Sequence, residues 1–391
     1  MAPPARRRPA PPSRRKPGAP PAKRPPNLAP PSAASPLRLR LRLRLPEPYD
    51  LGWMLGFLAD RAAPALESVE PGLLVRAIRV AGVPAVLTVR PVPADLTSTR
   101  WLAVEATASA SAASPTAGHG HDRATGRGDD LTAGHGDGRT AGRGDDPGTG
   151  DADSQVPGHY NDPAAVASAA LLRRLVRRMF DLDTALGPFL ELARRDPLLG
   201  PLVARRPGLR LPQLPDPFEG AVRAIVGQQV SVAAARTVVD RLIRRLGEPF
   251  AVAGRDLFAF PDPAAMAAAS PESLTALGLT RAKAASLIAV AAATAAGAVD
   301  WERLRGATPE AAQAALLALP GIGPWTASYI RMRALGDRDA FPASDLGVVK
   351  ALASLAPRTT PAGIAGIAGL AERWRPFRAY AAIHLWRSLS P

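Results

Sequence analysis

The spacing of the apolar residues changes near Asp162, and this change limits the folds open to the chain. Before it, leucine and arginine alternate strictly over 37–45, "LRLRLRLRL". A period of two residues predicts a strand with one buried face. After Asp162, apolar residues recur every three or four positions to the end of the chain, which predicts helices. We therefore expect an α+β protein with a small sheet-containing part followed by a helical part.

The N-terminal part contains further strand and helix patterns. Residues 48–63 have helical spacing, and 73–80, 83–92 and 100–108 are short strand-like runs. These patterns predict an N-terminal α+β domain over 36–184, with an antiparallel sheet. The helical patterns beyond it predict an all-α core over 185–391, built of two subdomains and without further strands.

Two segments carry no folding pattern. Residues 1–35 are rich in proline and hold eight Lys/Arg but no acid, which predicts a disordered basic arm, either a solubilising tail or a DNA tether. Residues 109–160 repeat "TAGHG" and "GRGDD" at a spacing of 16 residues and have almost no apolar content. We expect a disordered insertion there, with His119, His121 and His135 as solvated side chains and no metal site.

Charge and cysteine content narrow the function classes. The net charge is +15, which indicates an anionic partner, either nucleic acid or a membrane surface. The absence of cysteine excludes disulfides, thiolate zinc sites and cysteine-ligated iron–sulfur clusters. No apolar run approaches the ~20 residues of a membrane helix, and no secretion signal follows the early arginines. We therefore expect a cytoplasmic protein, associated with the nucleoid and not with a membrane.

The run "LALPGIGPWTASYI", Leu317–Ile330, predicts a tight turn between two helices, with the whole hairpin over 311–335. Unpaired amides at such a turn and at the following helix N-terminus can bind a phosphate. A nucleotide loop would follow a strand and end in Gly-Lys-Ser/Thr, whereas here a helix precedes and Trp325 follows. A simple interhelical turn is the remaining alternative, but it needs one glycine and not the run from Pro320 to Pro324.

These residues resemble the helix-hairpin-helix DNA glycosylases. "LPGIGPWTA" is followed by "FPASDLGVVKAL", and three more stretches, "PYDLGWMLGFLADRA", "PDPFEGAVRAIVGQQVSVAAA" and "RWRPFRAYAAIHLW", resemble the DNA-3-methyladenine glycosylase II family. The likeness runs from about Leu37 to Ser388 apart from the insertion. The ordered set of motifs is specific, whereas the hairpin alone would indicate only DNA binding.

The resemblance implies removal of an alkylated base that has been flipped out of duplex DNA. Asp345 would be the catalytic carboxylate that stabilises the oxocarbenium-like sugar or activates water. The alternative role of Asp345 is purely structural, as the N-cap of a helix. The catalytic and capping roles are compatible. Lyase relatives have a lysine where this chain has Trp325, so we expect a monofunctional enzyme that leaves an abasic site.

The resemblance also assigns the residues around the flipped base. Trp325, Tyr329, Phe377 and Gln228 would line the base pocket, and Gln229 would fill the gap in the DNA. From spacing alone, Trp325 and Tyr329 could equally be ordinary core residues. The two glutamines could equally lie on a polar helix surface. We expect Trp374, Tyr380, His384 and Trp386 to be core residues. The phosphate-binding residues would be Gly321, Ile322, Gly323 and Thr326.

Two rival functions remain open. One is a non-catalytic helix-hairpin-helix DNA-binding protein, and the other is a glycosylase for oxidised or deaminated bases. We expect a monomer acting on double-stranded DNA with alkylated bases, without an organic cofactor and with at most a monovalent cation at the DNA-bound hairpin. The preferred lesion does not follow from the sequence.

Overall fold

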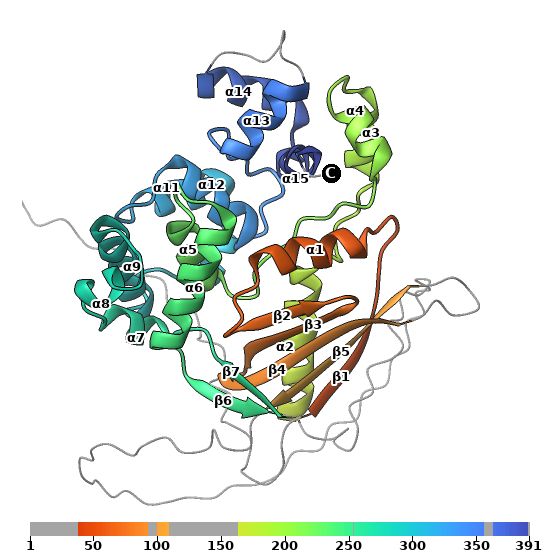
Figure 1. The fold of residues 1–391 in the computed structure, drawn as a ribbon. Coiled ribbons are helices and arrows are strands. Elements are labelled where there is room, and N and C mark those ends of the chain that lie inside the picture. The colour runs from red at the N-terminus through yellow and green to blue at the C-terminus, as the bar shows by residue number, and fades with distance from the viewer. Residues whose placement is uncertain (1–37, 93–99, 109–162, 253, 356–362, 390–391) are drawn as a thin grey trace, which may run out of the picture.

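The computed structural model describes residues 38–92, 100–108, 163–252, 254–355 and 363–389, and the basic arm and the repeated insertion lie outside them. An antiparallel sheet of five strands occupies the N-terminal part, in the order β1-β5-β4-β3-β2 (Figure 1). The strands are β1 (Arg38–Arg44), β2 (Glu67–Glu70), β3 (Leu73–Val80), β4 (Val83–Val92) and β5 (Trp101–Ala108). In β1 every leucine is buried and every arginine exposed, which confirms the strand predicted from the alternation.

Two helices pack on this sheet. They are α1 (Leu51–Arg61) and α2 (Pro163–Met179), which returns after the insertion. Leu172 and Val176 of α2 join the leucines of β1 in one apolar cluster, together with Met54 of α1. The alternating pattern of β1 thus buries its leucine face under a helix.

The rest of the described chain is mostly helical, as expected. The helices are α3 (Gly187–Arg195), α4 (Leu199–Arg205), α5 (Pro217–Val226), α6 (Val232–Leu246), α7 (Pro263–Ala267), α8 (Pro271–Thr275), α9 (Arg281–Ala295), α10 (Trp301–Arg305), α11 (Pro309–Leu317), α12 (Pro324–Arg333), α13 (Leu346–Leu355), α14 (Gly363–Ala371), the 3-10 turn η1 (Glu372–Trp374) and α15 (Arg378–Ser388). The expectation of a strand-free core was wrong, because β6 (Pro249–Val252) and β7 (Arg255–Phe258) form a two-stranded hairpin.

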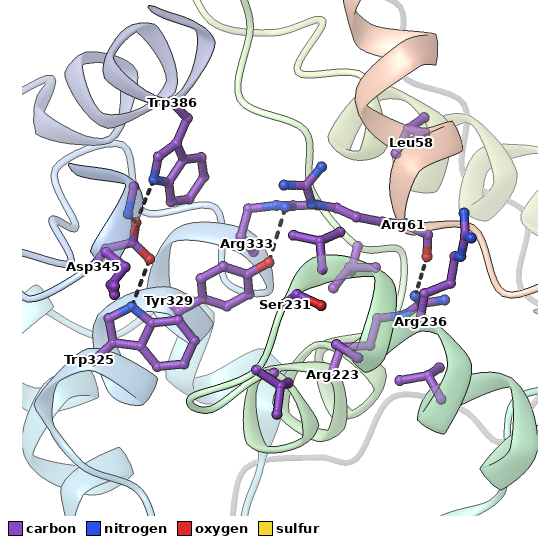
Figure 2. Close-up of a pocket in the computed structure, with 18 of the residues that line it drawn as sticks. Leu58, Arg61, Arg223, Ser231, Arg236, Trp325, Tyr329, Arg333, Asp345 and Trp386 are labelled. Atoms are coloured by element: carbon purple, nitrogen blue, oxygen red, sulfur yellow. Dashed lines mark hydrogen bonds between the residues drawn. The ribbon is translucent and has the colours of Figure 1, made fainter. Parts of the chain in front are cut away.

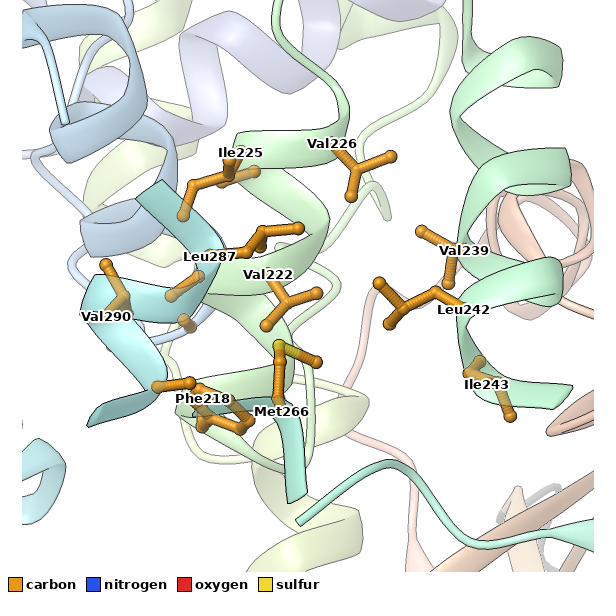
Figure 3. Close-up of a cluster of buried hydrophobic side chains, with 14 of the residues drawn as sticks. Phe218, Val222, Ile225, Val226, Val239, Leu242, Ile243, Met266, Leu287 and Val290 are labelled. Carbon is orange, nitrogen blue, oxygen red and sulfur yellow. The ribbon is translucent and has the colours of Figure 1, made fainter. Parts of the chain in front are cut away.

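The helices divide between two apolar clusters. In the first, α5 lies between α6 and α9, and Val222, Leu242 and Leu287 represent the three helices (Figure 3). This cluster also takes in Val75 and Ala77 of β3, so the sheet and the helices share a core. In the second, α3 and α4 pack against α15, which in turn packs against α13, although α3 and α15 lie far apart in the sequence (Figure 1).

The functional region lies where these parts meet. Helices α5 and α6 are separated by a loop over 227–231, and α11 and α12 form the expected hairpin. No helix among the described residues has both the length and the apolar character needed to cross a bilayer.

Candidate active site

A cavity of about 410 Å³ lies between the sheet-containing part and the helices (Figure 2). Strands β2 and β3, helices α1, α5, α6, α12 and α15 and the start of α13 supply its walls. The lining residues are Leu58, Arg61, Glu67, Arg76, Leu214, Arg223, Gly227, Val230, Ser231, Val232, Ala235, Arg236, Val239, Trp325, Tyr329, Arg333, Asp345, Leu346, Gly347, Trp386 and Leu389. Its volume falls in the range of pockets that enclose small molecules or single bases.

The carboxylate of Asp345 lies at one end of this cavity and accepts four hydrogen bonds. The indole Nε1 of Trp325 donates to Oδ2 at 3.0 Å, and Nε1 of Trp386 donates to Oδ1 at 2.8 Å. Backbone amides of Gly347 and Val348 donate to Oδ1 at 2.9 and 3.1 Å, as at a helix N-cap. The N-cap reading of Asp345 is therefore confirmed, and the two indoles fix the orientation of the carboxylate toward the cavity.

Aromatic rings surround this carboxylate. The rings of Trp325 and Tyr329 stack with centroids 5.3 Å apart, because residues four apart share a face of α12. The ring of Trp386 lies 6.4 Å from that of Tyr329. Three electron-rich rings in a partly buried site can stack on a flat heterocycle, cationic or neutral.

The turn between α11 and α12 lies close by and presents unoccupied backbone donors. Helix α12 begins at Pro324, and its N-cap residue Gly323 provides no side-chain cap, whereas Thr308 caps α11 and Ser231 caps α6. A Cβ on Gly323 would meet nothing within 4 Å, so a ligand can approach its backbone closely. Gly321 has φ +76°, which favours glycine in this turn.

Two of the predicted phosphate-binding residues take other roles in the fold. The amide of Ile322 donates to the Leu319 carbonyl at 3.2 Å, and its side chain is buried in the core. The hydroxyl of Thr326 accepts a hydrogen bond from Gln228 at 2.9 Å and is buried. The amides of Gly323 and of the first turn of α12 have no side-chain cap, and phosphate binding by Gly321, Ile322, Gly323 and Thr326 stays a prediction.

Gln228 does not line the cavity, and its assignment to the base pocket was wrong. Its Nε2 donates to the Gly321 carbonyl at 3.0 Å and to the Thr326 hydroxyl, which ties the loop over 227–231 to the hairpin. The ammonium of Lys283 holds the same loop by donating to the carbonyls of Val226 and Gln228 at 2.9 and 2.6 Å. These bonds fix the loop beside the cavity.

Gln229 lies exposed at the tip of this loop, with φ +55°. A non-glycine residue in this region is uncommon and is tolerated only where its surroundings hold it. The exposed side chain is compatible with the predicted insertion into DNA, which stays a prediction.

Phe377 and Trp386 exchange the positions expected of them. Phe377 is buried against Phe189 and Tyr380 in the core and does not line the cavity, so its assignment to the base pocket was wrong. Trp386, expected in the core, supplies the third ring of the site. Both residues belong to one C-terminal segment, and spacing does not tell which ring faces the cavity. The predictions of buried Trp374, Tyr380 and His384 are confirmed.

The sequence reasoning missed a wall of arginines opposite Asp345. Arg223 and Arg76 are paired there with Glu67 and Glu219, and these four residues join the sheet to α5. Arg61 and Arg333 also face the cavity. Arg333 could have been found, because 325, 329 and 333 are spaced four apart and share one face of α12.

The rim of the cavity is apolar and exposed. Val230, Val232, Leu346 and Leu389 line it, and each is at least 45% exposed. Apolar side chains gathered around an opening indicate a surface that contacts a partner. Among the described residues no cluster of three His, Asp or Glu could hold a metal ion, and the three histidines of the insertion lie outside those residues.

The comparisons with known proteins agree with this arrangement. Residues 222–368 match the family described as HhH-GPD superfamily base excision DNA repair protein, and residues 39–118 match the AlkA N-terminal domain. The chain is 31% identical over 339 residues to DNA-3-methyladenine glycosylase 2 of Escherichia coli, covering 87% of this chain and 94% of that protein.

Two further similarities differ in extent. A probable bifunctional transcriptional activator/DNA repair enzyme AlkA of Mycobacterium tuberculosis is 40% identical over 220 residues, 54% of this chain, and the match spans 42% of that relative's length. A solved 3-methyladenine DNA-glycosylase from Archaeoglobus fulgidus shares the fold, with a TM-score of 0.65, 21% identity and coverage of 88% and 97%.

Fold and hairpin place the chain in the helix-hairpin-helix superfamily that is described by its role in base excision DNA repair. Within that superfamily the chain belongs to the DNA-3-methyladenine glycosylase 2 family. The expected α+β class, with a helical core behind an antiparallel sheet, is confirmed.

Proposed function

We propose that this protein is a monofunctional DNA glycosylase that removes alkylated bases from double-stranded DNA. The observation that carries the proposal is the Asp345 carboxylate, held by two indoles at the end of a base-sized aromatic cavity. A DNA-binding protein without catalysis needs the hairpin but not this carboxylate. Family membership and the uncapped hairpin beside the cavity support the proposal.

Binding of the DNA backbone would begin at the hairpin. The amides of Gly323 and the first turn of α12 would bind a phosphate, favoured by the positive end of the helix dipole. Gln229 would enter the duplex where the base has left, and the target base would enter the cavity between Trp325, Tyr329 and Trp386. The apolar rim would cover the sugar and exclude water from the bond being broken.

Cleavage would follow from charge stabilisation. As the bond from C1′ to the base nitrogen breaks, positive charge develops on the sugar, and the Asp345 carboxylate lies at the cavity end where it can stabilise that charge. Water then bonds to C1′ and gives up a proton, which leaves an abasic site. The oxygens of Asp345 are the acceptors available for this proton among the described residues near the indoles.

The absence of a lyase step is also part of the proposal. A lyase needs an amine that attacks the sugar, and no lysine of the described residues lines the cavity. Position 325 carries tryptophan, and Lys283 is engaged by two carbonyls of the neighbouring loop. We expect no covalent adduct after borohydride treatment of the enzyme with damaged DNA.

Base release from methylated duplex DNA tests the function. We expect wild type to release methylated purines and Asp345→Asn, which keeps the size of the side chain, to lose release by about 10²-fold or more while still binding DNA. Equal DNA binding by both proteins with no release by wild type would favour the non-catalytic alternative. An adduct trapped by borohydride would instead indicate a glycosylase/lyase.

A further inference from the structure

Two arginines face the cavity without a direct ion pair to a carboxylate among the described residues. No carboxylate of the described residues forms an ion pair with Arg61 or Arg333, although Arg76 and Arg223 beside them are each paired twice. Arg333 is only 2% exposed. The carboxylates of Asp60 and Asp345 act on Arg61, and that of Glu67 acts on Arg333, only through space and not in a direct ion pair. A buried guanidinium without a direct ion pair is costly, so such a pair indicates a site whose occupant supplies negative charge.

The protein contacts of these guanidinium groups leave several donors free. Arg333 donates from Nε to the Pro212 carbonyl at 2.5 Å and from Nη1 to the Tyr329 hydroxyl at 3.4 Å. Arg61 donates from Nη1 to the Phe57 carbonyl at 3.2 Å. Arg61 also hydrogen-bonds the side chain of Tyr329. Each guanidinium carries five N–H donors, so each keeps donors for an acceptor that enters the cavity.

Both groups are held in place by Phe57 and remain charged. Their Cζ atoms lie 3.6 Å (Arg61) and 4.6 Å (Arg333) from the centre of the Phe57 ring. Burial first, and then the nearby charges of Arg61 and Arg223, lower the pKa of Arg333 to about 10. Burial also lowers the pKa of Arg61. Since a pKa of about 10 still leaves Arg333 protonated at neutral pH, it keeps its positive charge.

Arg61 and Arg333 lie where they would face the far edge of a leaving base. Asp345 and the indoles lie at one side of the cavity, Tyr329 lies between, and Arg61 and Arg333 lie beyond it (Figure 2). A base stacked near Tyr329 with its sugar toward Asp345 would therefore direct its far edge to the two guanidinium groups. Positive charge at this edge does not suit a cationic base, which leaves as a neutral molecule.

We propose that Arg61 and Arg333 form an electrophilic subsite that stabilises the departure of neutral bases bearing an exocyclic carbonyl, of which hypoxanthine is the simplest purine. This assignment rests on the glycosylase function proposed above. A neutral purine takes the electron pair of the C1′–N9 bond and leaves as an anion, whose charge spreads to the carbonyl oxygen and ring nitrogens. Water bonds to C1′, and the proton that it loses ends on the purine. The two guanidinium groups stabilise the anion before that proton arrives.

Two substrates distinguish this role from a structural one. The first is a duplex with one deoxyinosine, and the second is dimethyl-sulfate-treated DNA scored for 3-methyladenine, which is cationic and lacks a carbonyl. We expect Arg61→Met to slow single-turnover release of hypoxanthine by about 100-fold and of 3-methyladenine by about threefold or less. Arg61→Lys, which keeps the charge, should restore most of the hypoxanthine release.

Arg333→Met should also slow hypoxanthine release more than 3-methyladenine release. If the Arg333 variant does not fold, the Arg61 variants still decide the test, because Arg61 is only half-buried. Arg255→Met, on β7 and away from the cavity, is the matched control for loss of one positive charge and should change neither rate. An equal loss on both substrates, or no loss, would overturn the subsite. Release of neither base by wild type would instead count against the proposed glycosylase function.

Discussion

The indole nitrogen of Trp386 lies 2.8 Å from Oδ1 of Asp345, across 41 residues of sequence. This bond joins the last helix to the start of α13 and orients the carboxylate together with Trp325. The carboxylate therefore depends on two rings from two different helices, and each ring has a role besides stacking.

Trp386→Phe should separate these two roles. The variant keeps an aromatic ring but removes the donor to Asp345, so the carboxylate loses part of its orientation. We expect single-turnover base release to fall by about 10–100-fold while DNA affinity changes little. Trp374→Phe serves as the contrast, because Trp374 is fully buried and donates to Asp196. It should lower the melting temperature without a matching loss of rate per folded molecule.

The two glycines of the hairpin should respond differently to alanine. Gly321 has φ +76°, and a Cβ there would lie 1.9 Å from Oγ of Ser286, so Gly321→Ala should lower the free energy of unfolding by about 1–3 kcal/mol or more. Gly323 has no atom within 4 Å of an added Cβ, so Gly323→Ala should fold normally but bind DNA more weakly. Denaturant unfolding and DNA titration separate the two; a Gly323 variant with unchanged DNA affinity would count against the phosphate site.

The two adjacent glutamines should also differ. Gln228→Ala removes the hydrogen bonds to Gly321 and Thr326, and we expect it to lower the free energy of unfolding by about 1 kcal/mol and to weaken DNA binding. Gln229→Gly removes an exposed side chain and relieves the positive φ, so stability should not fall. Base release should nevertheless decrease if Gln229 fills the gap in the duplex. Thermal unfolding and single-turnover rates of the two variants check this division.

His384 should make the protein sensitive to acid. Burial lowers its pKa from 6.5 to about 3, and its Nε2 has no hydrogen-bond partner among the described residues. Below pH 6.5 the unfolded chain binds a proton on His384 that the folded protein does not bind. The contribution of the neutral His384 to the free energy of unfolding is therefore fully present above pH 6.5 and is lost as the pH falls from 6.5 toward 3. The slope is at most about 1.4 kcal/mol per pH unit. His384→Gln should flatten it in urea unfolding between pH 4 and 7, and parallel curves would contradict the prediction.

Short strands and long-range hydrogen bonds limited what the sequence could predict. Strands β6 and β7 have four residues each and little alternation, so their pairing is visible only in the fold. The break between α5 and α6 falls in an otherwise helical pattern, at Gly227, and depends on the bonds from Lys283 and Gln228. Local patterns do not contain such long-range bonds.

The sequence by itself determined the order of the elements apart from β6 and β7, the hairpin turn, and Asp345 as a helix-start carboxylate. These follow from residues close together in the chain, where periodicity and turn chemistry act locally. That Trp325 stands in the place of a lysine follows from the resemblance to the glycosylase family. Only the tertiary structure decided that Trp386 and not Phe377 faces the cavity, and that Arg61 and Arg333 meet there. The cavity is assembled from β2, β3, α1, α5, α6, α12, α13 and α15, and which side chain faces it depends on how these elements pack.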